Sequence, residues 1–252
     1  MKRGGHPEHE IAHGQLLVAG GAGDIWGWET PAGLHRVAAR VAWLSRVCRL
    51  GPGRRVLECG CGTGIFTRRL AATGAEITAV DISDALLDEA RRSCQAPNVR
   101  FCRCNLEHPS ELPDGHFDAL LGISVLHHLD LPVALPALLK KLKRGADVAF
   151  SEPNLLNPIN RYVIFTDDMD KRRRLGVSPT EMAFRPDELA RAFQDAGLTV
   201  HSLRHRDFLH PRTPRLAIGL FKAAAFLAER LPLVRRMSGS LWIHAKLPEN
   251  AP

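Results

Sequence analysis

The pattern of apolar and polar positions divides most of the chain into alternating strands and helices. Short runs rich in leucine and β-branched residues predict buried strands, whereas apolar residues at intervals of three and four predict amphipathic helices. Strands are expected near 55–59, 76–80, 98–102, 117–122, 146–151, 198–205 and 240–246. Helices are expected near 33–49, 64–73, 84–94, 132–143 and 186–197. This alternation predicts an α/β fold, with right-handed crossovers and helices on both faces of a parallel sheet.

Three segments fall outside the alternation. Residues 1–32 are rich in glycine and histidine and show no clear periodicity before Trp26, so we expect a flexible N-terminal arm. Residues 153–185 and 207–237 are insertions that flank the sixth strand. The remaining pattern therefore predicts one domain over 33–252, with these two insertions as caps over its ligand site.

The second insertion contains an apolar stretch over 214–236. Its apolar run is interrupted by Lys222, so it is too short and too charged to span a bilayer. We favour core packing or a cover over a substrate pocket. A peripheral membrane contact stays open as an alternative, because three arginines follow the apolar run, at positions 230, 235 and 236.

Composition narrows the classes of partner. The 252-residue chain has a formal net charge of +7, and basic surfaces attract nucleic acid. However, arginine is spread along the chain and there is a single tyrosine for base stacking. Solvated basic faces or an anionic membrane surface explain the charge at least as well, so no nucleic-acid partner is expected.

The cysteines indicate a reducing compartment. The opening residues show no continuous apolar segment of the kind found in a signal peptide, so the six cysteines are expected to be free thiols in the cytoplasm. Cys59 and Cys61 form one C-x-C pair, and Cys102 and Cys104 form another. Zinc sites more often use C-x-x-C spacing, so we predict no metal site.

A glycine-rich turn follows the first strand. Gly60, Gly62 and Gly64 alternate after Glu58, and glycine is needed where the backbone approaches a ligand or adopts positive φ. The G-x-G-x-G spacing departs from the G-x-G-x-x-G fingerprint of dinucleotide sites, so NAD is not expected. Asp81 ends the second strand, where a carboxylate suits the ribose hydroxyls of a nucleoside lying across the strand ends.

The motifs resemble those of the class I S-adenosylmethionine-dependent methyltransferases. The likeness is strongest to the small-molecule group called methyltransferase type 11, which includes enzymes of ubiquinone and menaquinone biosynthesis. It rests on Val56–Gly64, Ala79–Ser83, Phe117–Leu129 and Leu142–Ala146, and it covers roughly 33–206. The resemblance implies a Rossmann-like, seven-stranded, mostly parallel sheet with an antiparallel last strand, and S-adenosylmethionine as the cofactor.

The same resemblance implies a set of cofactor-binding residues. They are Arg36, Glu58, Gly60, Cys61, Gly62, Gly64, Asp81, Ile82, Asn105, Leu106, Gly122 and Ile123. Glu58 is expected to orient the cofactor's amino group, and Asp81 to bind the ribose. Asn105 stands where the family more often has aspartate, yet its amide oxygen can still accept from the adenine amino group. Arg36 or Arg40 is expected to meet the cofactor carboxylate, and exposure to solvent is the alternative for both.

Two adjacent histidines follow the fourth strand. Methyl transfer to a hydroxyl requires loss of a proton, and an imidazole is suited to that role, so His127 and His128 are candidate bases. A packing or helix-capping role is the alternative for both. The candidate substrate-binding residues lie in the arm and the first insertion, and they are Trp26, Trp28, Asn157 and Tyr162.

The sequence thus predicts a methyltransferase that acts on a small, largely apolar acceptor. Methylation of oxygen is favoured over nitrogen or carbon. One alternative is a nucleic-acid or protein methyltransferase, although no Asn/Asp-Pro-Pro-Tyr/Phe-type tetrad of base-modifying enzymes follows the fourth strand. Another is a catalytically silent nucleoside-binding module, against which the complete set of cofactor motifs argues.

Overall fold

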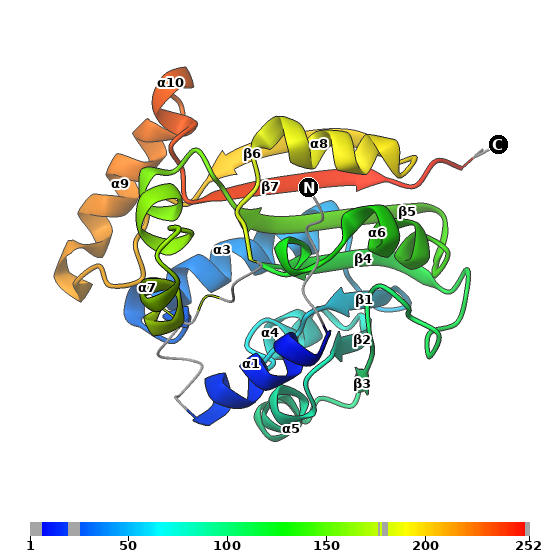
Figure 1. The fold of residues 1–252 in the computed structure, drawn as a ribbon. Helices are drawn as coiled ribbons and strands as arrows, with labels where there is room; N and C mark the ends of the chain where they lie inside the picture. The colour runs from blue at the N-terminus through cyan, green and yellow to red at the C-terminus, as the bar shows by residue number, and fades with distance from the viewer. Residues whose placement is uncertain (1–6, 20–25, 176, 178–180, 250–252) are drawn as a thin grey trace.

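A seven-stranded sheet forms the centre of the computed structural model, with the strand order β3-β2-β1-β4-β5-β7-β6 (Figure 1). The structure describes residues 7–19, 26–175, 177 and 181–249. Strand β7 pairs antiparallel with both β5 and β6, whereas the other neighbouring strands pair in parallel. The predicted Rossmann-like sheet with an antiparallel last strand is confirmed. The strands are β1 (Arg55–Cys59), β2 (Glu76–Asp81), β3 (Val99–Arg103), β4 (Phe117–Ile123), β5 (Leu142–Pro153), β6 (Thr199–Arg206) and β7 (Ser240–Lys246).

Helices cover both faces of this sheet because successive strand residues point to opposite sides. Leu57 of β1 packs in a core with α6 and α8, whereas Val56 packs in a second core with α3, α4 and α5. The helices are α1 (Pro7–Ala19), α3 (Pro31–Val47), α4 (Thr67–Leu70), η1 (Ala71–Thr73), α5 (Asp84–Ser93), η2 (Leu126–His128), α6 (Leu131–Leu139), η3 (Asn160–Ile164), α7 (Met169–Arg174), α8 (Pro186–Asp195), η4 (Arg215–Ala217), α9 (Ile218–Ala228) and α10 (Pro232–Arg235).

Helix α1 is an element that the hydrophobic pattern did not predict. The flexible-arm expectation for 1–32 assigned no regular structure here, yet 7–19 form a helix that packs on α5. Gly14 permits the close approach, because a Cβ at this position would collide with the side chain of Ser83. The polar and apolar residues of α1 are not segregated to opposite faces, so its sequence has no amphipathic signal.

Helix α9 differs from the favoured expectation of core packing or a pocket cover. Only its first residue, Ile218, is buried, and it packs against Ala32 and Leu209. The rest of the helix projects beyond the end of the sheet, on the same side as α7 and α10 (Figure 1).

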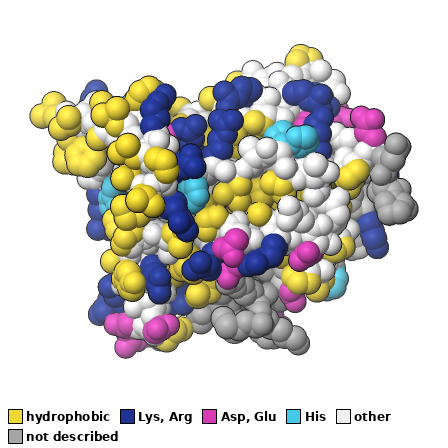
Figure 2. Space-filling model, turned by 90° about the horizontal axis from the view of Figure 1, so that it is seen from above, with side chains coloured by type: hydrophobic (Ala, Val, Ile, Leu, Met, Phe, Trp, Pro, Cys, Tyr) yellow, Lys and Arg dark blue, Asp and Glu magenta, His cyan; other side chains and the backbone are white. Residues whose placement is uncertain are grey.

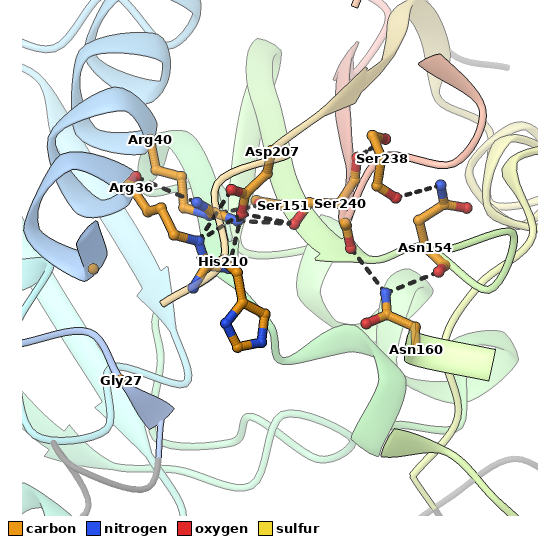
Figure 3. Close-up of polar contacts among 12 residues, drawn as sticks. Gly27, Arg36, Arg40, Ser151, Asn154, Asn160, Asp207, His210, Ser238 and Ser240 are labelled. Atoms are coloured by element: carbon orange, nitrogen blue, oxygen red, sulfur yellow. Dashed lines mark hydrogen bonds and ion pairs between the residues drawn. The ribbon is translucent and has the colours of Figure 1, made fainter. Parts of the chain in front are cut away.

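A buried cluster of charges ties α3 to the second insertion (Figure 3). Arg40 is 2% exposed and its Nη2 lies 2.6 Å from Oδ2 of Asp207. The same guanidinium donates to the hydroxyls of Ser151 on β5 and Ser240 on β7. Arg36 donates through Nε to both carboxylate oxygens of Asp207. Burial alone would raise the pKa of Asp207, but Arg40 and Arg36 outweigh it and hold the pKa well below its usual range.

We expect Asp207→Asn to lower the free energy of unfolding by about 3–5 kcal/mol, because it leaves Arg40 buried without its counter-ion. The depressed pKa means that the stabilisation by Asp207 is complete above its unfolded pKa of ~3.9 and is lost as the pH falls further. Urea unfolding at pH 7 measures the effect. Asp88→Asn is the control, since that exposed pair with Arg91 should contribute little. Equal stability of Asp207→Asn and the wild type would contradict the assignment.

Candidate active site

A cavity of about 760 Å³ lies where the carboxyl ends of the parallel strands meet. Its walls come from α1, from the segment around Trp26 and Trp28, and from the loops that follow β1 to β4. The two insertions complete it through residues within 153–175, Val177, Glu181 and 207–212. In open α/β sheets this edge is the usual place for a ligand. The cavity has the size and the mixed apolar and polar lining of a small-molecule site.

The glycine turn and Asp81 build the part of the cavity that fits a nucleoside. Gly60 and Gly62 both have positive φ, 63° and 54°, a conformation that side chains disfavour. Asp81 accepts hydrogen bonds from the backbone N–H groups of Gly62, at 2.9 Å, and Ser83, at 3.0 Å. Burial raises the pKa of Asp81, and these two bonds oppose that shift. The carboxylate is therefore fixed in orientation, and it lies in the cavity wall.

Most of the residues predicted to bind the cofactor line this cavity. They are Arg36, Gly60, Cys61, Gly62, Asp81, Ile82, Asn105, Leu106 and Ile123. Gly64 and Gly122 do not line it and serve packing instead, because a Cβ at Gly64 would meet α5 and one at Gly122 would meet Phe150.

Glu58 is likewise absent from the cavity wall. Its carboxyl is fully buried, and this burial raises its pKa to about 8, against a smaller opposing effect of the Thr67 hydroxyl. Burial therefore favours the neutral form of Glu58. The expected contact of Glu58 with the cofactor's amino group stays a prediction, and a carboxyl outside the cavity wall could act there only through the glycine turn.

Three other side chains expected to contact the cofactor already have partners within the protein. Arg36 and Arg40, expected to meet the cofactor carboxylate, both bind Asp207 (Figure 3). The exposed position weighed for Arg40 is wrong, since the side chain is buried. Asn105 lines the cavity while its Oδ1 accepts from the backbone N–H of Glu107 at 3.0 Å, which fixes the loop after β3.

His127 is held in one orientation by a carboxylate that the motifs did not indicate. Its Nδ1 lies 2.8 Å from Oε2 of Glu152, at the end of β5. The other oxygen of Glu152 accepts from the backbone N–H groups of Val125 and Leu126, both at 3.1 Å. Glu152 is fully buried, and His127 lies in the cavity wall. Because Nδ1 faces Glu152, Nε2 is the ring nitrogen left for other contacts, and it lies 3.8 Å from Oε2 of Glu181, which also lines the cavity.

His128 has a different environment, although its ring centroid is only 4.3 Å from that of His127. Its Nδ1 lies 2.9 Å from Oε2 of Glu10 on α1 and 3.8 Å from Oε1 of Glu181. Burial alone would lower the pKa of His128, but Glu181 and Glu10 outweigh it and raise the pKa to about 9. The carboxylates thus favour the imidazolium form of His128, which suits an ion pair with α1 better than the role of a base.

The group of His127, His128 and Glu181 also has the composition of a metal site, which the sequence analysis did not consider. One ligand atom from each lies within 4.8 Å of the other two. Metal binding requires neutral imidazoles. The carboxylates around His128 favour its charged form instead, so the arrangement fits an ion-paired cluster better.

The predicted substrate residues separate into two groups. Trp26, Trp28 and Asn157 line the cavity. Trp28 packs edge-on against Phe66, and Asn157 uses its amide to donate to the carbonyl of Met237. The prediction that Tyr162 binds the substrate is not supported, because this residue is 64% exposed and does not line the cavity.

Sequence reasoning missed several residues that shape the site. Glu152 ends an apolar strand with an acid, as Glu58 and Asp81 do, so that signal was available. Ser124 lines the cavity with a positive φ of 53°, which nothing in its residue type indicates. Glu10 and Glu181 lie in the arm and the first insertion, where no motif marks them.

We expect Asp81→Asn to weaken the binding of S-adenosylhomocysteine by about 1.5–3 kcal/mol, because hydrogen bonds to a charged acceptor contribute about that much. Titration calorimetry at pH 7 measures the change. The matched control is Glu58→Gln, which replaces a buried carboxyl outside the cavity and should leave the affinity near that of the wild type. A larger loss in Glu58→Gln than in Asp81→Asn would reverse the two assignments.

Removing the carboxylate of Glu10 should lower the pKa of His128 from about 9, because one of its opposing negative charges is lost. The raised pKa means that the contribution of this ion pair to stability is complete below ~6.5 and disappears as the pH rises through about 9. An NMR titration of the histidine Cε1–H signals in the wild type and in Glu10→Gln measures the shift. An unchanged pKa in Glu10→Gln would show that α1 is not held by this pair.

Comparison with known proteins identifies the family. A family model described as a methyltransferase domain matches residues 56–145. An uncharacterised protein of Synechococcus sp. is 38% identical over 127 residues, and the match covers 48% of this chain but only 28% of that protein. The ubiquinone biosynthesis O-methyltransferase of Aromatoleum aromaticum is 29% identical over 200 residues, covering 76% of this chain and 85% of the relative.

Solved structures share the fold. The S-adenosylmethionine-dependent methyltransferase of Mesorhizobium loti superposes with a TM-score of 0.60 at 19% identity, covering 81% of this chain and 96% of that one. The sheet order, the glycine turn and Asp81 at the end of β2 occupy the positions that the sequence motifs implied. Residues 56–145 thus match a methyltransferase domain, and the chain has the fold of S-adenosylmethionine-dependent methyltransferases.

Proposed function

We propose that this methyltransferase methylates an oxygen of a small, largely apolar acceptor, with His127 as the general base and Glu152 as its positioning residue. The observation that carries the proposal is the 2.8 Å contact between Nδ1 of His127 and the buried Glu152 at the wall of the cavity. S-adenosylmethionine supplies an electrophilic methyl group on a sulfonium.

The acceptor's proton has a defined route under this proposal. The acceptor hydroxyl donates to Nε2 of His127, which takes the proton as the oxygen attacks the methyl group. Nδ1–H meanwhile donates to Glu152, which keeps the imidazole in the required tautomer and stabilises the imidazolium that forms. His128 does not compete for this role, because its raised pKa favours the protonated form.

The lining of the cavity supports an apolar acceptor. Both insertions contribute apolar side chains, namely Ile159, Val163, Phe165, Phe208 and Leu209. An apolar wall excludes water, which strengthens the electrostatic contact between His127 and Glu152. Similarity to ubiquinone biosynthesis O-methyltransferases is in line with small-molecule O-methylation.

The alternatives fit the site less well. A nucleic-acid or protein methyltransferase has to admit part of a large polymer, whereas this cavity is roofed by α1 and two insertions and has the volume of a small-molecule site. Methylation of carbon or nitrogen uses the same cofactor position, but the oriented base favours a hydroxyl. A silent nucleoside-binding module would have no need of the buried Glu152–His127 pair.

We expect His127→Ala to lower turnover by ~10²–10⁴-fold, the usual effect of losing a general base. The acceptor is first found with radiolabelled donor and a panel of phenols, quinone precursors, sugars and lipids. The affinity for S-adenosylhomocysteine should stay near that of the wild type, and the acidic limb of the pH–rate profile should disappear. Glu152→Gln should lower turnover as well, because the amide no longer enforces the tautomer of His127.

His128→Ala provides the comparison for the neighbouring imidazole. Its loss should affect turnover far less than the loss of His127, because a protonated His128 does not act as a base. If His127→Ala keeps turnover within a few-fold of the wild type at every pH, the proposed base is wrong. In that case alignment of donor and acceptor carries the reaction.

A further inference from the structure

The α9–α10 segment, residues 215–237, presents an apolar surface that nothing in the described structure covers. Apart from Ile218 and Val234, its large apolar side chains are exposed, and Leu216 and Leu233 are 100% and 79% exposed. The others are Leu220, Phe221, Phe226, Leu227, Leu231 and Met237. A helix that is apolar on all sides is ordinarily buried, and contiguous exposed apolar patches mark interaction sites. The surface therefore requires a partner.

The charges around this surface favour an anionic partner. Residues 208–237 contain six basic side chains but a single acid, Glu229, which already pairs with Arg206. Figure 2 shows hydrophobic side chains gathered on the left, where α9 and α10 lie in Figure 1, with Lys and Arg side chains among them. The basic residues are Arg212, Arg215, Lys222, Arg230, Arg235 and Arg236. A second copy docked through the same patch would bring like charges together.

A cationic pocket lies at the base of α10. It has a volume of about 400 Å³ and is lined by Arg185, His205, Arg235 and Arg236, with Asp187 as its acid. Asp187 pairs with Arg185 at 3.5 Å and with Arg191 at 2.7 Å. Nδ1 of His205 is buried and has no hydrogen-bond partner among the residues that the structure describes. This arrangement offers several donors to a phosphate group.

We propose that the α9–α10 segment binds the surface of a bilayer that contains anionic phospholipid, with the cationic pocket receiving a headgroup phosphate. The apolar side chains of α9 would enter the interface while the arginines stay at headgroup level. With 11 residues, α9 is only about 16 Å long. None of the described helices is long and apolar enough to cross a membrane. The mode of attachment is therefore monotopic.

The segment also follows directly, along the chain, from part of the cavity wall. Residues 207–212 line the cavity and lead directly into η4 and α9. An acceptor that partitions into lipid would thus meet the enzyme next to the apolar wall of the cavity. This consequence rests on the proposed function, whereas lipid binding itself does not.

Vesicle flotation tests the proposal, with vesicles of phosphatidylcholine alone or mixed with phosphatidylglycerol. The wild type should float with the mixed vesicles, and Leu220→Glu/Leu227→Glu should not. Arg235→Gln/Arg236→Gln should lower the partition coefficient for mixed vesicles roughly 30-fold, about fivefold for each basic residue. Its matched control is Arg91→Gln/Arg92→Gln, which removes the same charge from the exposed face of α5. Val133→Glu on α6 is the control for adding an acid at an exposed apolar position.

Failure of the wild type to float with mixed vesicles would overturn the proposal, as would equal losses in the two arginine double variants. Equal flotation of Leu220→Glu/Leu227→Glu and the wild type would also overturn it. Dimerisation of the wild type that this apolar variant abolishes, without vesicle binding, would assign the face to a second copy. Affinity for S-adenosylhomocysteine and turnover of a water-soluble acceptor should be unchanged in every variant. A variant that loses turnover but still binds vesicles would count against the proposed function and not against lipid binding.

Discussion

The turn that carries His127 depends on the buried carboxylate of Glu152. A buried charge is costly unless its oxygens are bonded, and here three donors satisfy it: two backbone N–H groups and the imidazole of His127. Because the donors lie in the turn after β4 and the acceptor lies at the end of β5, the contact joins two neighbouring strands. The strained backbone of Ser124 sits at the same junction. One carboxylate thus fixes both the turn after β4 and the orientation of His127.

The two halves of the cavity are built by different means. One half comes from loops that follow consecutive strands, so the sheet itself brings the glycine turn and Asp81 together. The other half comes largely from the two insertions. They are not held in place by the sheet, so other contacts have to fix their position. Asp207 supplies it on one side, through its ion pairs with Arg36 and Arg40 on α3. Asn154 and Asn160 supply it on the other, since their amides donate to backbone carbonyls of 236–239 (Figure 3).

The sequence predicted the sheet, and most of the residues it assigned to the cofactor do line the cavity, because both depend on local patterns. It could not predict contacts between distant positions, such as Arg40 with Asp207, which lie 167 positions apart. A residue that belongs to a cofactor motif does not always line the cavity. Glu58 stands at a motif position, yet it lies buried outside the cavity. The exposure of α9 could not be predicted from its sequence. An apolar helix has the same sequence pattern whether it packs against protein or against lipid.

A crystal structure with bound S-adenosylhomocysteine tests the central claim most directly, since it shows which residues hold the cofactor and which face the reacting atom. The account predicts ribose hydroxyls on Asp81, the methionine portion over Gly60 and Gly62, and the sulfur turned toward the part of the cavity that contains His127. Binding elsewhere, or in an orientation that places His127 away from the sulfur, would contradict it.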